Sequence, residues 1–206
     1  MTLKASVGSP FARILSVGAA TPSRVIDNEY LLQYIDSSDE WITQRTGIRE
    51  RRWIGEDEDI KTLSLTAGRQ AIERAGVDVA EIDAVILSTI SHYHQTPALA
   101  PQLATELGLT DAAAFDISAA CAGFSYGLAQ AEALVRSGQA RYVLLIAGET
   151  ISEITDLTDR GTAFLFGDGA GAVLVGPSET NGIGPVVWGS DGSQAGVIWQ
   201  TKSWQD

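Results

Sequence analysis

The amino-acid sequence predicts an α/β fold built around a mostly parallel sheet. Apolar runs rich in β-branched residues alternate along the chain with segments whose apolar residues recur at helical spacing. The chain has 206 residues, which is enough for one domain or for one and part of a second. Hydrophobic residues make up 45% and charged residues 19% of the chain, a balance typical of a folded domain with a real core.

Local patterns predict the elements in the first part of the chain. Residues 12–18 read as a strand that ends at a glycine. Ser37 is followed by a glutamate three residues later, the spacing of a capping box, and this predicts a short helix that ends at Gly47. Apolar residues at helical spacing over 60–75 predict a second helix, with Gly76 as its C-terminal cap.

The rest of the chain continues the alternation of strands and helices. Residues 84–90 form a continuous apolar run, the pattern of a strand buried on both faces. Helices are expected at 98–107 and from about Cys121 to Arg136, the latter closed by Gly138. Apolar runs predict four further strands, at 113–117, 142–147, 170–175 and 184–188.

The balance of charges argues against several classes of protein. Lys and Arg number 14 and Asp and Glu number 26, so the net charge is −12, and we expect no nucleic-acid partner. The single cysteine excludes an internal disulfide and indicates a reducing compartment. No signal-peptide pattern opens the chain, and no run approaches the ~18 apolar residues of a membrane span. We therefore expect a cytoplasmic protein without a membrane partner.

The run of small residues at 117–124 is the sharpest local feature, and it contains Cys121. A buried strand is expected to run into it, and a helix is expected to begin at the cysteine. A helix N-terminus carries free N–H groups and partial positive charge, which stabilise a thiolate and make it a nucleophile. A buried structural thiol is the alternative, because free cysteine is among the most buried residue types.

Two further motifs resemble binding sites only weakly. Residues 167–172 match the G-x-G-x-x-A variant of a dinucleotide fingerprint, but a strand pattern follows where a helix should open. A tight turn is therefore favoured over binding of a nicotinamide cofactor. His92 and His94 would share one face of an extended segment, but no third ligand stands out, so we expect loop histidines and no metal site.

Four stretches together resemble β-ketoacyl-acyl-carrier-protein synthase III, the initiating condensing enzyme of dissociated fatty acid synthesis. Their order and spacing fit from about residue 12 to the end of the chain. The stretches are 36–42 with 45–48, then 115–124, then 159–162, then 166–172. The resemblance implies a thiolase-like layered αβαβα fold. The chain would supply its first half, residues 1–180, and the start of an incomplete C-terminal half, residues 181–206.

The resemblance also implies a reaction and a set of site residues. Cys121 would take an acyl group from acyl-CoA, and malonyl-acyl carrier protein would then lose CO2 and attack the acyl thioester. The backbone N–H of Cys121 would help to form an oxyanion hole. Trp41 would stack on the adenine of CoA, with Arg45 and Arg160 near its adenine and phosphates. Thr46 would assist, and no cofactor is implied beyond acyl-CoA as substrate.

The resemblance gives Thr96 a role in choosing the primer. Thr96 matches a position at which some members of the family carry a bulky aromatic residue that limits the acyl pocket across the dimer interface. Threonine is much smaller, so the hypothesis is that branched or longer primers are accepted and not only acetyl.

A basic island in this acidic chain raises the question of carrier docking. Its residues could meet phosphate or an acidic partner, or they could form a solvated face. Carrier protein is acidic, so docking needs a local basic patch. The candidates for that patch are Arg49, Arg51 and Arg52.

The chain departs from the family pattern in its length. The family's catalytic His and Asn lie beyond Asp206, and neither His92 nor His94 matches that His. The chain is expected to supply the nucleophile of a homodimeric enzyme, completed by a missing C-terminal half or by a second polypeptide. The alternatives are a polyketide or secondary-metabolite starter synthase, a hydroxymethylglutaryl-CoA synthase relative, and a non-catalytic truncated half that binds CoA or a partner.

Overall fold

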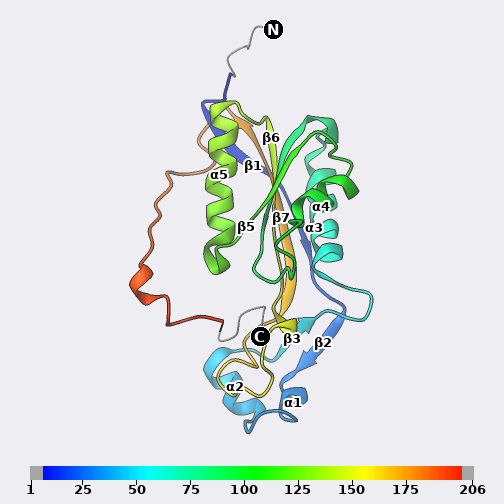
Figure 1. The fold of residues 1–206 in the computed structure, drawn as a ribbon, viewed down its shortest axis with the longest axis vertical. Coiled ribbons are helices and arrows are strands. Elements are labelled where there is room, and N and C mark those ends of the chain that lie inside the picture. The colour runs from blue at the N-terminus through cyan, green and yellow to red at the C-terminus, as the bar shows by residue number, and fades with distance from the viewer. Residues whose placement is uncertain (1–6, 201–206) are drawn as a thin grey trace.

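The main sheet of the computed structural model, which describes residues 7–200, has five strands (Figure 1). β4 pairs in parallel with β5 and β6, whereas β7 pairs antiparallel with β1 and β6. Four of the five strands therefore share one direction and β7 alone opposes them, which confirms the prediction of a mostly parallel sheet. The spatial order is β1 (Phe11–Ala20), β7 (Asp168–Ser178), β6 (Tyr142–Thr150), β4 (Ile82–Ser88) and β5 (Ala113–Ile117).

Helices cover both faces of this sheet. α3 (Ile60–Ala75) and α4 (Ala100–Glu106) cover one face, and α5 (Gly123–Ser137) covers the other (Figure 1). β4 serves both faces because successive side chains of a strand point to opposite sides. Val85 and Leu87 join the apolar cluster beneath α3 and α4, whereas Ala84 and Ile86 join the cluster beneath α5. The described residues thus form three layers of the five-layer arrangement that the resemblance implies.

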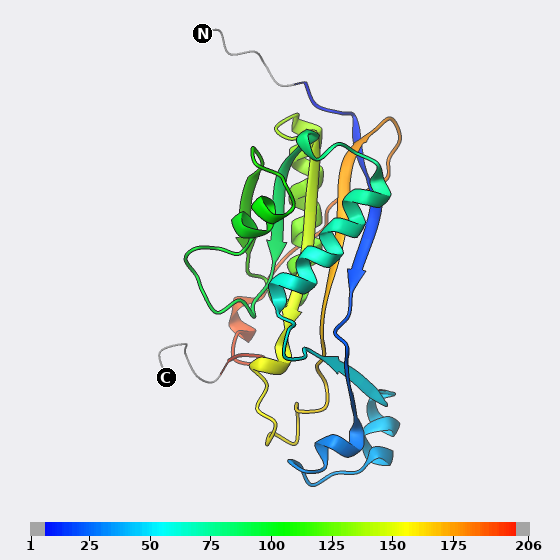
Figure 2. The same ribbon diagram turned by 90° about the vertical axis from the view of Figure 1, so that its right-hand side faces the viewer.

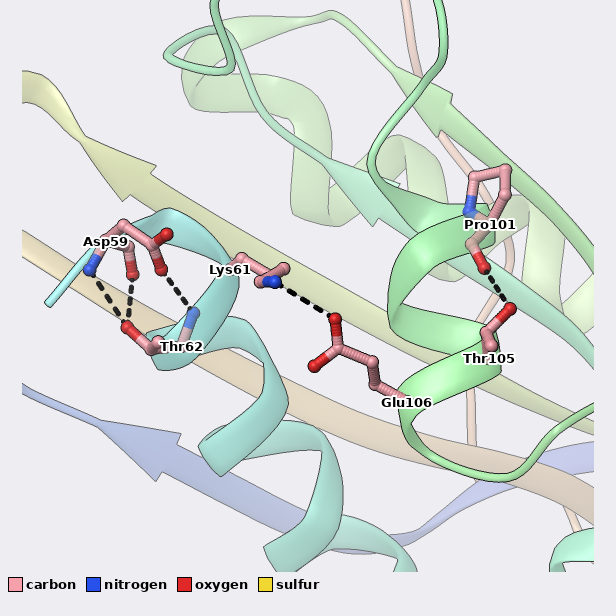
Figure 3. A network of polar contacts seen from close by, with 6 residues as sticks. All are labelled: Asp59, Lys61, Thr62, Pro101, Thr105 and Glu106. Carbon is pink, nitrogen blue, oxygen red and sulfur yellow. Dashed lines mark hydrogen bonds and ion pairs between the residues drawn. The ribbon is translucent and has the colours of Figure 1, made fainter.

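The ends of α3 follow from its sequence. Asp59 is the N-cap and forms a reciprocal capping box with Thr62, and Gly76 closes the helix in the left-handed conformation, as predicted. Figure 3 shows this cap beside the ion pair between Lys61 Nζ and Glu106 Oε1, 3.0 Å long, which ties α3 to α4. The pair is largely exposed, so it contributes about 0–1 kcal/mol.

A small module, of which local patterns predicted only the helix that ends at Gly47, lies beyond one end of the sheet (Figures 1 and 2). It has its own apolar core of Ile26, Leu31, Ile35, Ile42 and Trp53, closed by Ala163 and Phe164 of a later loop. Its strands are only four residues long and rich in charge, which hides them from apolar patterns. The module comprises β2 (Arg24–Asp27), α1 (Asn28–Leu31), α2 (Asp39–Thr46) and β3 (Glu50–Trp53).

The first turn of α2 differs from the prediction. Ser38, not Ser37, is the N-cap, and its Oγ accepts a hydrogen bond of 3.1 Å from the backbone N–H of Trp41. Ser38 has the extended backbone that a cap needs, whereas the Ser37 hydroxyl is buried without a hydrogen-bond partner. The predicted end of the helix at Gly47, which adopts φ 75°, is confirmed.

Asp168 fixes the small module to the sheet. Its carboxylate accepts hydrogen bonds from the backbone N–H groups of Ile54 and Ser152, each 2.9 Å long. Asp168 pairs with Thr150, the last residue of β6. The small module therefore sits at the end of the sheet where the parallel strands finish, the end at which α/β sheets bind ligands.

Two predicted strands need correction. β5 exists as predicted but is not buried: Phe115 is 36% exposed, because β5 lies at the sheet edge with a strand neighbour on one side only. Residues 184–188 form no strand; Val187 is 95% exposed, and no neighbouring strand is present in the described chain for the segment to pair with. Residues 168–172 lie within β7, which confirms the predicted strand pattern; the tight turn expected at 167–172 is wrong, because these glycines are part of the extended strand.

Short 3₁₀ turns complete the description of the chain. They are η1 (Val79–Glu81), η2 (Ala120–Ala122), η3 (Ile151–Glu153) and η4 (Gly192–Gln194). Among residues 7–200, no helix is both long and apolar enough to cross a lipid bilayer.

Candidate active site

Cys121 lies in η2, the turn between the end of β5 and the start of α5. Its thiol is exposed, which contradicts the alternative of a buried structural cysteine. The preceding residue, Ala120, has φ 44° and is the one non-glycine residue with positive φ in the described part of the chain. This conformation costs a residue with a Cβ about 1–2 kcal/mol, and such strain concentrates at functional sites.

Close backbone packing holds this turn against the sheet. A Cβ on Gly123, the first residue of α5, would lie 1.8 Å from the Ser88 Oγ at the end of β4. A Cβ on Gly127 would lie 2.4 Å from the Leu145 side chain of β6. Glycine at both positions therefore lets α5 approach the sheet closely. The thiol is held at the head of a helix, where backbone N–H groups and the positive end of the helix dipole lie close by.

Glu149 anchors the loop that follows β4, a role that the sequence patterns did not indicate. Its carboxylate accepts hydrogen bonds from the backbone N–H groups of Ile90 and Ser91 and from the hydroxyls of Thr89 and Ser91. Burial raises the pKa of Glu149, and this effect outweighs the hydrogen bonds that lower it. The nearest sequence signal was its position just after the predicted strand at 142–147.

The raised pKa of Glu149 predicts a pH-dependent difference between wild type and Glu149→Gln. A folded-state pKa above the ordinary 4.5 means that the folded protein binds this proton more tightly than the unfolded chain. The cost of the buried charge is present near neutral pH and is relieved as pH falls through the folded pKa. The unfolding free energy of E149Q minus that of wild type should therefore decrease from about pH 7 to about pH 5. Urea denaturation at each pH measures this difference, and a constant difference would contradict the assignment.

The structure brings three of the predicted CoA-binding residues together. The guanidinium carbon of Arg45 lies 4.1 Å from the centroid of a Trp41 ring, and that of Arg160 lies 5.0 Å away. Arg160 Nε also donates a 2.6 Å hydrogen bond to the carbonyl of Asp36. Phe164 meets the indole edge-on at 5.6 Å. We call Trp41, Arg45 and Arg160 the Trp41 cluster; it presents an aromatic surface with two fixed cations.

Thr46 has a local structural role at the end of α2. Its hydroxyl donates to the carbonyl of Ile42 at 2.8 Å and accepts from the backbone N–H of Ile48 at 3.0 Å. These bonds satisfy backbone groups at the helix end beside Arg45.

The basic island does not form one exposed surface. Arg51 is only 6% exposed and donates to the carbonyls of Ile26 and Phe164, so it is withdrawn as a docking residue. Arg49 and Arg52 are exposed. The alternating pattern of β3, along which side chains point to opposite faces, explains why Arg51 points inward while Arg52 points outward; Arg49 precedes the strand.

The loop after β4 carries His92, His94 and Thr96. This loop is distant in the sequence from the residues of the Trp41 cluster. The two imidazole ring centroids are 5.7 Å apart. Over residues 7–200, no group of three or more His, Cys, Asp or Glu side chains is arranged to hold a metal ion. Thr96 is exposed.

The comparisons with known proteins agree with these features. The sequence model of the family described as 3-oxoacyl-[acyl-carrier-protein] synthase III matches residues 115–192, the region of Cys121 and α5. A β-ketoacyl-[acyl-carrier-protein] synthase III from Streptomyces coelicolor is 55% identical over 202 residues, which cover 98% of this chain and 59% of the relative. One from Mycobacteroides abscessus is 52% identical over 193 residues, covering 94% and 57%.

Solved structures show the same likeness. The priming β-ketosynthase of the R1128 polyketide pathway superimposes with a TM-score of 0.94 at 47% identity and covers 100% of this chain and 61% of its own. The β-ketoacyl-acyl carrier protein synthase III of Thermus thermophilus gives 0.86 at 42% identity, covering 91% and 58%.

The layered sheet, with an exposed cysteine on a strained strand-to-helix turn, is that of the thiolase-like fold. Within that fold, the matching family model and the half-identical relatives show that the chain is similar to the β-ketoacyl-acyl carrier protein synthase III family. It spans about three fifths of the length of the relatives that it matches, 59% in the case of the Streptomyces coelicolor protein.

Proposed function

We propose that this chain is the nucleophile-bearing part of a β-ketoacyl-acyl carrier protein synthase III. The reaction joins an acyl-CoA primer to malonyl-acyl carrier protein with loss of CO2 and initiates fatty acid synthesis. One observation carries the proposal: the exposed Cys121 on the strained turn at the head of α5. Relatives that bear the name of this enzyme and are more than 50% identical in sequence also support the proposal.

The first half-reaction uses groups of this chain. The Cys121 thiolate attacks the thioester carbonyl of acyl-CoA, a new S–C bond forms, and the S–C bond to CoA breaks, so that CoA leaves as its thiolate. The carbonyl oxygen becomes negatively charged in the transition state, and the backbone N–H of Cys121 at the helix head is placed to stabilise it. Acyl-Cys121 is then the electrophile for the carbanion that malonyl-acyl carrier protein forms on losing CO2.

The Trp41 cluster is the proposed CoA-binding surface. A flat adenine between Trp41 and Arg160 needs two contacts of about 3.5 Å, or about 7 Å in all. The present separation of 5.0 Å is shorter, so insertion there moves the Arg160 side chain outward by about 2 Å. Arg45 stays free to meet phosphate, because no carboxylate pairs with it among the described residues.

Trp41→Ala should raise the KM for acetyl-CoA and change kcat little. Stacking of a base on an aromatic ring is worth about 1–3 kcal/mol, which corresponds to roughly 5- to 150-fold in KM. Steady-state condensation kinetics of the enzyme completed by its remaining catalytic half, with malonyl-acyl carrier protein held constant, measures the effect. Trp188→Ala is the matched control, because Trp188 is 62% exposed and contacts Tyr126 instead of the Trp41 cluster. Equal KM values for the two variants would refute the proposed CoA surface.

A priming ketosynthase of a polyketide pathway is the second candidate. The likeness to the R1128 enzyme, with a TM-score of 0.94, favours it. The chemistry at Cys121 is the same in both cases, and analysis of products with different malonyl carriers separates them. Thr96 is proposed to set the primer in either case, with room for branched or longer acyl groups.

The remaining features of the proposal concern assembly. We propose residues 1–180 as the nucleophile-bearing half and residues 181–206 as the start of the second half. The enzyme is proposed to act as a cytoplasmic homodimer, with a C-terminal half or second polypeptide supplying the remaining catalytic groups. A non-catalytic half is the competing reading, and failure of the protein to become acylated on Cys121 would favour it.

A further inference from the structure

Two buried polar side chains join the two segments that carry the Trp41 cluster. Asn28, 1% exposed, begins α1, and Arg51, 6% exposed, lies on β3. Among the described residues, neither side chain forms a hydrogen bond to the indole of Trp41; they bond instead to the backbone and side chains that hold α2 and the 156–167 loop. Trp41 and Arg45 lie on α2, and Arg160 lies on that loop.

Asn28 holds both ends of α2. Its Nδ2 donates to Asp39 Oδ1, at the first residue of α2, at 2.7 Å, and to the carbonyl of Ile48, just past the helix, at 2.9 Å. Thr43 Oγ1, midway along the helix, lies 3.4 Å from the same nitrogen. The Oδ1 of Asn28 accepts a 2.7 Å hydrogen bond from Arg51 Nη2. The position of α2 is therefore tied to the guanidinium of Arg51.

Arg51 continues the connection to the opposite segment. Its Nη2 donates to the carbonyl of Phe164 at 3.1 Å, and its Nη1 donates to the carbonyl of Ile26 on β2 at 3.2 Å. One planar guanidinium thus spans β2, Asn28 and the loop that bears Arg160. Arginine suits such a site because its donors form a rigid fork, whereas a lysine ammonium is a compact group on a flexible stem.

Burial of the charged Arg51 guanidinium does not by itself stabilise the fold. No carboxylate lies within ion-pair distance of it among the described residues, and its Nε is buried without a hydrogen-bond partner. Burial lowers the pKa of Arg51, with Asp27 opposing the effect. An apolar side chain in a buried position is often as stabilising as a buried charge. The advantage of arginine at this position therefore lies in how its hydrogen bonds position the segments that it contacts.

We propose that Arg51 and Asn28 are positioning residues that set the separation between Trp41 and Arg160 and thereby the affinity for the nucleotide part of the acyl donor. The inference rests on the proposed function, because it concerns the same CoA-binding surface. Neither residue touches the reacting thioester. A displacement of one segment by about 1 Å is enough to weaken a well-oriented site severely.

The test compares two acyl donors on the same protein sample. Acetyl-CoA carries the adenine and phosphates, whereas S-acetylpantetheine carries the same thioester without them. The rate of acetyl transfer to Cys121 is measured by intact mass for each donor. Partial misfolding lowers both rates in proportion, so the ratio of the rates reports only on the nucleotide-binding surface.

Arg51→Lys should lower the ratio of the acetyl-CoA rate to the S-acetylpantetheine rate by about tenfold or more. Arg24→Lys is the matched control, because Arg24 is an exposed arginine of the same small sheet that bonds only to Tyr30 in the described contacts, and its ratio should equal that of wild type. In a Trp41→Ala background, R51K should lower the ratio no further, because the surface it positions is already lost.

The results that would refute the positioning role differ from the result that would refute the proposed function. An unchanged ratio in R51K, or a ratio lowered equally in R24K, would overturn the positioning role. Wild-type protein that accepts acetyl from neither donor would overturn the proposed function itself. If R51K yields no folded protein, Asn28→Asp decides by the same ratio, since it keeps the acceptor for Arg51 but places a carboxylate against Asp39 and loses the donor to Ile48.

Discussion

Cys121→Ser is expected to abolish the mass adduct that acetyl-CoA leaves on the purified protein and to lower acyl transfer by at least about 10³-fold. A serine hydroxyl has nearly the same size but, without an adjacent general base, stays protonated near neutral pH. Cys121 is the single cysteine of the chain, so peptide mapping has one thiol to assign. Intact-mass spectrometry before and after incubation with acetyl-CoA measures the result.

The control for this experiment lies one turn along α5. Ser125 is exposed near the start of the same helix, so Ser125→Ala should leave the adduct in place. An adduct that persists in C121S, or that maps to another residue in wild type, would show that Cys121 is not the nucleophile. The untreated sample also shows whether a second polypeptide accompanies the chain.

Gly18→Ala should destabilise the fold by about 1–3 kcal/mol or more. A Cβ on Gly18 of β1 would lie 2.0 Å from the carbonyl oxygen of Ala67 and 2.8 Å from the backbone nitrogen of Ala71, both in α3. Side-chain rotation cannot relieve a clash with backbone, so α3 must move away from the sheet. That movement also strains the 2.5 Å hydrogen bond from Ser16 Oγ to the Ala71 carbonyl. Urea denaturation gives the change in unfolding free energy.

The sheet supplies a matched control for this substitution. Gly171 on β7 pairs with Ala19, the neighbour of Gly18, and a Cβ on Gly171 would meet nothing within 4 Å. Gly171→Ala should therefore be neutral or stabilise the fold by about 0.4–1 kcal/mol through the unfolded chain. Equal destabilisation by both substitutions would mean that the contact between β1 and α3 is looser than the structure indicates.

Burial on both faces made the framework of this fold predictable. The central strands β4 and β6 each contain an unbroken apolar run, at 84–87 and 142–147, and α3 carries its apolar residues at helical spacing up to the Gly76 cap. Each of these signals is local, because a residue must be apolar wherever the sheet or a helix covers it.

Local sequence patterns did not predict the structure of segments whose conformation depends on residues far away in the sequence. The strands of the small module are four residues long and include the charged Arg51, whose burial depends on the carbonyls of Ile26 and Phe164. Residues 184–188 are as apolar as a strand but have no strand beside them in the described chain. β5 was recognised, yet its exposure follows from its place at the sheet edge.

The sequence by itself determined the α/β framework, the candidate nucleophile Cys121 and, through resemblance, the residue types of the CoA surface. Only the tertiary structure decided that Cys121 is exposed on a strained turn, that Arg45 and Arg160 both lie against the Trp41 ring, and that a buried guanidinium joins their segments. Arg160 bonds to a carbonyl 124 positions earlier in the chain. Such contacts depend on the chain topology, which brings distant segments together and which no local spacing of residues encodes.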